Sequence, residues 1–232
     1  MNGKSASILA IGIIIAAFVW GAFFLSTRNE QSIRVVGQGV KTVTSDLAKW
    51  NITINRDTNV AYKSEGPSWI QEDLNKVKKY LASNGIEEKD ILVEPVNSYA
   101  NYGNNGITGY SFNQRIEVRS NDIEKLEKMA LDSKALAKQD IYLHYSDLEY
   151  FVSNLAELKA EMLALATVDA KARALEIAKS SGNKVCGLLS AKSGVFQIRK
   201  PLSTDVSDYG IYNTSSKEKE IAVTVTATFK IK

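Results

Sequence analysis

The stretch Leu155–Ser180 reads LAELKAEMLALATVDAKARALEIAKS and predicts the longest helix of the chain beyond its N-terminal region. Asn154 and Glu157 have the spacing of a capping pair at its start, and Gly182 follows its end. Alanine, the strongest helix former, fills many of its positions and lets a neighbouring element approach closely. The larger apolar side chains that we expect to form its buried stripe are Leu155, Leu158, Met162, Leu165 and Val168.

The elements around this helix are predicted from the periodicity of their apolar residues. Helical spacing extends over residues 64–83 and again after Asn121, whereas alternation with a period of two predicts strands. The expected strands are residues 33–39, 47–54, 90–102, 110–119, 139–150, 186–199 and 219–232. This order predicts an α+β fold with mixed or antiparallel sheets and helices packed on one face, preceded by a single N-terminal transmembrane helix.

The motif Gly37-Gln38-Gly39 lies inside the first expected strand. A phosphate-binding loop would need a third glycine and a helix directly after it, whereas Val40 continues a strand-like sequence. We therefore interpret the two glycines as a bulge or as a close backbone contact.

The predicted transmembrane helix is the run ILAIGIIIAAFVWGAFFL, residues 8–25, which contains no charge, no proline and no strongly polar side chain. Its length is about the minimum that crosses a hydrocarbon layer roughly 30 Å thick. The run is longer than the apolar part of a usual signal peptide and lacks an A-x-A-like cleavage site. We expect an uncleaved anchor that includes Ile8, Trp20 and Leu25, with a cleaved export signal as the alternative.

This anchor divides the chain into a membrane segment, residues 1–28, and a domain in water, residues 29–232, with the lipid bilayer as the partner of the first. Lys4 before the run and Arg28 after it leave the orientation open. Without these two residues the domain has 27 basic and 26 acidic residues, a net charge of +1. Nucleic-acid binding needs a clustered basic surface, so nucleic acid is not an expected partner.

The sequence contains no recognisable catalytic constellation. His144 is the single histidine and lies in an expected strand, where a structural role is usual. Cys186 is the single cysteine and has apolar neighbours, so we expect a buried, inert thiol rather than a redox centre. No spacing suggests a zinc site or a nucleophile with its base, and we predict no catalytic residue, no metal site, no cofactor and no enzymatic activity.

Tyrosines gather in expected loops and at strand ends. They are Tyr99, Tyr102, Tyr110, Tyr209 and Tyr212. Such residues could form a surface that binds a glycan or a peptide, although aromatic residues at these places more often cover a core or an oligomer contact. A ligand-binding module is therefore the second hypothesis.

A set of short motifs in a fixed order resembles the SIMPL-domain family over residues 33–231. The motifs are Val36-Gly37-Gln38-Gly39-Val40, Leu81-x-x-x-Gly85-Ile86-x-x-x-Asp90-Ile91, Gly109-Tyr110-Ser111, Val118-Arg119, Asp122-Ile123-x-x-Leu126, Ala166-x-x-Asp169-Ala170-x-x-x-Ala174-x-x-x-Ala178 and Gly187-Leu188-Leu189. The chain departs from the family pattern at Ser45-Asp46, where Pro-Asp is common. The resemblance implies an extracytoplasmic envelope protein, sometimes linked to oxidative-stress tolerance, without a catalytic motif.

The resemblance also implies that residues 29–232 face the periplasmic or extracellular side of the cytoplasmic membrane. The leading hypothesis is a non-enzymatic envelope protein that acts by forming a homo-oligomer or by binding a protein partner whose identity the sequence does not give. The alanine-rich helix and the long terminal strand offer flat surfaces for such association.

Overall fold

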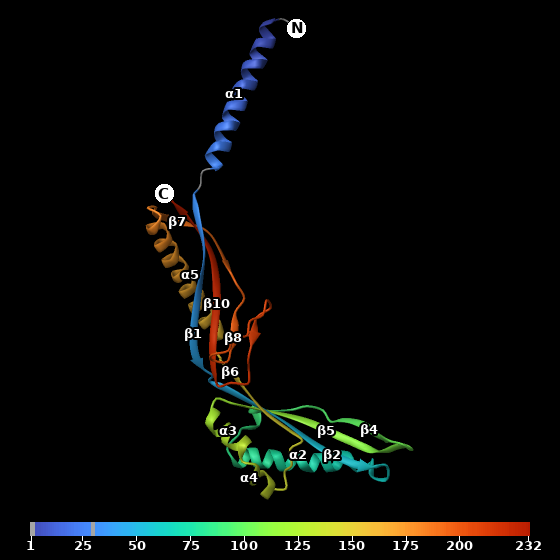
Figure 1. The fold of residues 1–232 in the computed structure, drawn as a ribbon. Coiled ribbons are helices and arrows are strands. Elements are labelled where there is room, and N and C mark those ends of the chain that lie inside the picture. Colours follow the sequence, from blue (N-terminus) through green and yellow to red (C-terminus); the bar gives the residue numbers. More distant parts are fainter. Residues whose placement is uncertain (1–2, 29–30) are drawn as a thin grey trace. The chain divides into compact units, whose positions relative to one another are not determined.

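The computed structural model describes residues 3–28 and 31–232, apart from the side chains of residues 3–10, 24–28 and 133 (Figure 1). In chain order the elements are α1 (Gly3–Arg28), β1 (Ser32–Thr44), β2 (Leu47–Asn59), η1 (Val60–Tyr62), α2 (Gly66–Ser83), η2 (Glu88–Asp90), β3 (Ile91–Val93), β4 (Asn97–Gly103), β5 (Gly106–Ser120), α3 (Ile123–Leu131), α4 (Ser133–Lys138), β6 (Tyr145–Phe151), α5 (Leu155–Ser180), β7 (Val185–Ser193), β8 (Gln197–Arg199), β9 (Ile211–Tyr212) and β10 (Glu218–Ile231). This mixture of helices and strands confirms the predicted α+β class.

The residues cluster into two compact units, neither of which is one continuous segment. Unit 1 comprises Met1–Val40, Lys159–Phe196 and Ala222–Lys232, and unit 2 comprises Lys41–Leu158 and Gln197–Ile221. The described strands form two five-stranded sheets, one in the order β1-β10-β8-β9 with β7 also paired to β10, the other in the order β3-β5-β2-β6 with β4 also paired to β5.

Unit 2 is built on the second of these sheets. The β2–β5 pairing is antiparallel, with Trp50 opposite Val118 and Ile52 opposite Ile116, and all four side chains are buried. The helices α2 and α3 lie along this face of the sheet (Figure 1). Burying each such large side chain contributes roughly 1.5–3 kcal/mol, so this face is the main core of the unit. Here the expected packing of helices on one face is confirmed.

In unit 1, α5 packs on the first sheet through its small residues. The buried positions recur at every fourth residue and are Met162, Ala166, Ala170, Ala174 and Ala178. The expected apolar stripe was wrong in part, because Leu165 is 43% exposed and Val168 is 66% exposed. The close approach of β1, described below, leaves room on this side of the helix for little more than alanine.

Two boundaries between residues 121 and 150 differ from the expectation because aspartates cap helices there. Asp122 caps α3 by accepting a hydrogen bond from the Lys125 amide at 3.1 Å, so the helix expected directly after Asn121 begins at Ile123. Asp132 accepts one from the Ala135 amide at 2.9 Å and so starts the unexpected helix α4. The strand expected at 139–150 therefore begins only at Tyr145.

The N-terminal run is helical in α1. Among the residues that the structure describes, no helix combines the length and the apolar character needed to cross a membrane. The predicted transmembrane helix is thus not confirmed. Trp20 is exposed, and the side chains of Ile8 and Leu25 lie outside the described residues.

Candidate functional site

The contact between β1 and α5 is made by backbone rather than by side chains. A Cβ atom on Gly37 would lie 2.7 Å from the Cα of Ala170, and one on Gly39 would lie 3.1 Å from the nitrogen of Ala166. Real Cβ atoms essentially never come within 3.0 Å of other atoms, and 3.1 Å is closer than nine in ten real Cβ contacts. The interpretation of the Gly37-Gln38-Gly39 motif as a close backbone contact is confirmed.

A hydrogen bond fixes the register of this contact. The amide of Gln38 donates to Oδ2 of Asp169 on α5 at 2.8 Å, and Nε of Arg173 donates to the same oxygen at 2.8 Å. The Gln38 amide, and after it Arg173, hold the pKa of the Asp169 carboxyl below its ordinary value. The Asp169 carboxylate of α5 therefore accepts a charge-assisted hydrogen bond from β1 between the two glycines.

Because alanines occupy most of the inner side of α5, several of its larger apolar residues lie outside. The exposed members are Leu165, Val168, Leu175 and Ile177. The sequence signal that distinguishes the two sides is the strict four-residue spacing from Met162 to Ala178, which marks the buried row. Leu165, Val168 and Leu175 follow one another at steps of three and seven residues and so share an outer side of α5, which is a candidate surface for association.

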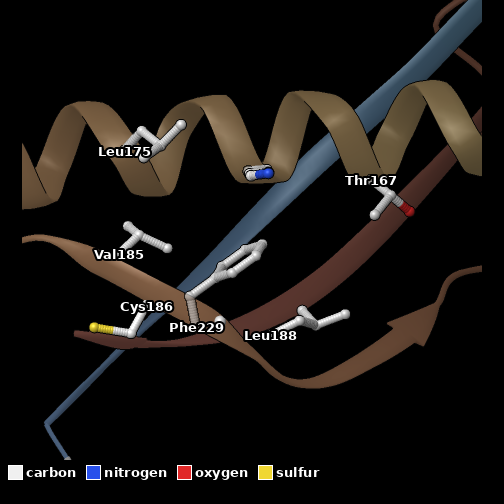
Figure 2. A pocket seen from close by; sticks show the side chains of 8 residues that line it. Thr167, Leu175, Val185, Cys186, Leu188 and Phe229 are labelled. Atoms are coloured by element: carbon white, nitrogen blue, oxygen red, sulfur yellow. The ribbon is translucent and has the colours of Figure 1, made fainter.

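A groove of about 270 Å³ continues this surface between α5 and β7. Figure 2 shows Thr167 and Leu175 on the helix, Val185, Cys186 and Leu188 on the strand, and the ring of Phe229 between them. Phe229 is buried, whereas Leu188 and Leu189 are exposed on β7. The floor of the groove is thus apolar. In the described part of the chain, β7 at its side pairs with β10 alone.

Cys186 is exposed at this groove, which corrects the expectation of a buried thiol. Its Sγ donates a weak hydrogen bond to the carbonyl oxygen of Lys184 at 3.7 Å. The apolar neighbours Val185 and Leu188 suggested burial, but β7 lies at the surface and all seven of its residues after Cys186 are exposed as well. Apolar sequence neighbours therefore did not indicate a core strand here.

The five tyrosines considered as a ligand surface lie at separate places of unit 2. Tyr99 is opposite Ser111 on the face of the sheet away from α2, whereas Tyr110 packs beside the core with Nζ of Lys63 at 4.3 Å from its ring centroid. Tyr102 is exposed near the β4–β5 turn. The structure therefore does not bring Tyr99 and Tyr110 onto one face.

The remaining two tyrosines lie in the segment between β8 and β10. Tyr209 is almost fully exposed, and Tyr212 stacks on Phe151 with ring centroids 6.0 Å apart. Its hydroxyl oxygen accepts a hydrogen bond from the Val152 amide at 3.5 Å. These contacts give Tyr212 a structural role, and a ligand role for either residue stays a prediction.

Lys219 is a buried charged residue that sequence reasoning missed, because it lies at the start of a strand like an ordinary surface lysine. Its side chain is fully buried, and Nζ donates to the carbonyl oxygens of Asn213 at 2.6 Å and Ser216 at 2.9 Å. Burial lowers its pKa to about 8. Through these two hydrogen bonds, the buried ammonium group of Lys219 holds the loop before β10 in place.

No group of three histidine, cysteine, aspartate or glutamate residues in the described part of the chain could hold a metal ion. His144 is exposed just before β6, where its backbone amide donates to the carbonyl oxygen of Thr53 at 2.8 Å. The candidate sites in the described part of the chain are therefore surfaces: the outer side of α5, the α5–β7 groove and the sheet face of unit 2.

Comparison with known proteins gives a family match over most of the chain. The model of the SIMPL family, described as "Protein of unknown function (DUF541)", matches residues 33–229. Among curated relatives, the 26 kDa periplasmic immunogenic proteins of Brucella melitensis biotype 1 and Brucella abortus (strain S19) are both 26% identical to the chain over 198 residues. The match covers 78% of this chain and 77% of each relative.

Solved structures give only faint likenesses. A hydantoinase/carbamoylase-family amidase from Burkholderia phymatum matches with 11% identity and a TM-score of 0.22, over 54% of this chain and 31% of the amidase. AtUAH in complex with glyoxylate matches with 12% identity and a TM-score of 0.21, over 56% of this chain and 31% of that protein. The chain thus spans about a third of these proteins, and a likeness this small establishes neither a shared fold nor a shared activity.

Proposed function

The chain belongs to the SIMPL family, and on that basis we propose that it is a non-enzymatic, extracytoplasmic protein that acts by associating with further copies of itself. The observation that carries this proposal is the exposure of large apolar side chains on α5. Leu165 and Val168 are exposed, whereas the alanines on the inner side of the helix are buried. Large apolar groups gain free energy when a partner removes them from water.

The α5–β7 groove supports the same proposal. Leu175 and Leu188 lie on its two sides, so the apolar surface continues from the outer side of α5 to the exposed strand β7. A second copy that covers this surface would bury apolar side chains and pair with β7, whose residues are exposed. Self-association through unit 1 accounts for both features.

The test is the molar mass of the full chain in detergent, measured by light scattering over a range of protein concentrations. We expect a mass above that of the monomer, which Val168→Lys lowers because a charge enters the apolar surface. Val60→Lys is the matched control, since Val60 is an exposed valine in unit 2. A strictly monomeric wild-type chain at high micromolar concentration contradicts the proposal.

We propose further that residues 8–25 direct the domain across the cytoplasmic membrane and hold it there. The names of the two Brucella relatives describe those proteins as periplasmic. The described side chains of α1, residues 11–23, are exposed and include Ile14, Phe18 and Trp20. Such side chains are unfavourable in water, so the segment needs an apolar environment or removal from the mature protein.

The intact mass of the protein recovered from cells separates these two outcomes. A membrane fraction that retains residues 1–28 and resists alkaline extraction supports the anchor. A periplasmic protein that begins after the apolar run identifies a cleaved export signal instead. Recovery of the full-length chain from the cytoplasm contradicts both.

A contribution to oxidative or envelope stress tolerance completes the proposal, as a property that family membership suggests. Survival of a deletion strain under peroxide and under detergent stress tests it. We expect lower survival that the wild-type gene restores and that a gene with Val168→Lys restores only in part. Equal survival of the deletion and parent strains excludes this role.

A further inference from the structure

The sheet of unit 2 has a second face, opposite to α2, whose residues follow from the strand register. One row contains Tyr99, Ser111 and Asp57 on β4, β5 and β2, and the next row contains Asn97, Asn113 and Asn55. We call these six residues together with Asn101 the carboxamide face. Along each strand they alternate with the residues of the opposite face.

The composition of this face is unfavourable for strands. Asparagine and aspartate are depleted in β-structure, where β-branched and aromatic residues are preferred. Here five of the seven residues are asparagine or aspartate, and they lie on three neighbouring strands. Sequences that depart from local preference in one place do so most often at functional sites.

The side chains of the face are only partly satisfied by one another. Nδ2 of Asn55 donates to Oδ1 of Asn113 at 2.9 Å, and among the described residues neither amide makes another side-chain hydrogen bond. Each amide carries two donor hydrogens and an oxygen with two lone pairs. The donors of Asn113 and the oxygen of Asn55 thus remain for a ligand, and Asn97 is exposed beside them.

A second hydrogen-bonded group holds the adjoining row in place. Nδ2 of Asn101 donates to Oγ of Ser111 at 2.9 Å, and Oγ of Ser111 donates to Oδ1 of Asp57. Tyr99 lies between Asn97 and Asn101 along β4 and is 53% exposed. An aromatic ring is thereby flanked on the same strand by two amides.

The charged side chains on this side of the sheet determine which class of ligand the carboxamide face can bind. The cations on the same side of the sheet are paired with carboxylates. In the row next to Asn113, a guanidinium nitrogen of Arg115 lies 3.8 Å from Glu94, and further along the sheet Nζ of Lys49 lies 2.6 Å from Glu149. Asp57 is the single ionisable carboxylate of the carboxamide face and accepts the Ser111 hydrogen bond. The face has no cation of its own, so it suits an uncharged, hydroxyl-rich ligand rather than a polyanion.

We propose that the carboxamide face binds an uncharged glycan chain. A sugar ring has an apolar face of C–H groups, which packs on an exposed aromatic ring, and a rim of hydroxyl groups that both donate and accept hydrogen bonds. Tyr99 supplies the ring, and Asn55, Asn97 and Asn113 supply donors and acceptors around it. An open sheet face of this kind suits several units of an extended chain.

This inference goes beyond self-association through unit 1 and is independent of it. The carboxamide face lies in unit 2, whereas the outer side of α5 lies in unit 1. A variant that abolishes association, Val168→Lys, is expected to retain glycan binding. Either proposal can therefore be contradicted by experiment while the other still holds.

The test uses the full chain in a detergent without a sugar headgroup, titrated with the neutral hexasaccharides chitohexaose, cellohexaose and maltohexaose. Calorimetry is expected to show binding of at least one of them. Tyr99→Ala is expected to weaken that binding roughly tenfold, which corresponds to the upper range of about 1.5 kcal/mol for an aromatic contact. Asn113→Ala is expected to weaken it as well.

Tyr142→Ala is the matched control, because Tyr142 is an exposed tyrosine in the same unit that lies outside the carboxamide face. Equal circular dichroism spectra of the variants show that the fold is retained. Absence of binding to all three sugars up to 10 mM, roughly the weak limit of useful affinity, overturns the proposal. Equal binding by Tyr99→Ala and wild type, or preference for the polyanion polygalacturonate, also overturns it.

Discussion

Gly37 of β1 and Ala170 of α5 lie so close that a Cβ on the glycine would be 2.7 Å from the Cα of the alanine. The contact explains why glycine occurs on the strand and alanine on the helix, since only small residues on both elements permit so close an approach. Larger residues on either side would separate α5 from the sheet.

Gly37→Ala is therefore expected to destabilise the protein by at least about 2 kcal/mol, since overpacking a rigid contact costs about 1–3 kcal/mol and here backbone must move. The midpoint of urea unfolding, followed by circular dichroism, measures the effect. Gly187→Ala is the control, because nothing lies within 4 Å of a Cβ at that position. Equal midpoints for the two variants would show that α5 moves aside at little cost.

Asp169 is expected to make stability depend on acid pH. Its folded pKa is lowered, foremost by the Gln38 amide, so its contribution is present above the unfolded pKa and is lost as the pH falls through the folded pKa. The stability difference between wild type and Asp169→Asn should accordingly shrink when the pH falls below about 4. A difference that is constant from pH 7 to pH 2.5 contradicts this assignment.

Lys219 is expected to make stability depend on alkaline pH, in the same direction as Asp169 does in acid. Burial lowers its folded pKa to about 8, below its value of about 10.4 in an unfolded chain. Between these values the unfolded chain binds more protons, so stability rises with pH relative to Lys219→Met. Urea midpoints of both proteins from pH 7.5 to 10.5 measure this, and parallel curves would show that the lysine is solvated.

Cys186 is expected to react with a thiol reagent in the folded protein, since it is exposed. In dilute protein the rate should be within about tenfold of that of the unfolded chain, because an exposed thiol is accessible to the reagent in both states. If copies associate through the α5–β7 groove, the rate falls as protein concentration rises. Complete protection at nanomolar concentration would show that the thiol is buried.

The fold class could be predicted from sequence because alternation and helical spacing are local signals. The bounds of α5 were predicted at both ends, and the glycines of β1 were interpreted correctly. The orientation of α5 could not be predicted in this way. Ranking its residues by size placed Leu165 and Val168 inside, whereas the space left by Gly37 and Gly39 selects the alanines.

The candidate sites were harder to predict because they depend on strand register. Tyr99 and Tyr110 are close in sequence but lie on opposite faces, since β4 and β5 pair Tyr99 with Ser111 and Tyr110 with Ala100. The row of Asn55, Asn97 and Asn113 joins residues from three strands. Neither relationship can be seen before the pairing is known.

The strands β1 and β10 each begin in one unit and end in the other, at Val40–Lys41 and at Ile221–Ala222. Unit 1 therefore cannot be completed during synthesis until residues 222–231 have left the ribosome, because β1 pairs with β10. The second sheet is different in this respect, because all five of its strands lie within residues 47–151 and are made before β10.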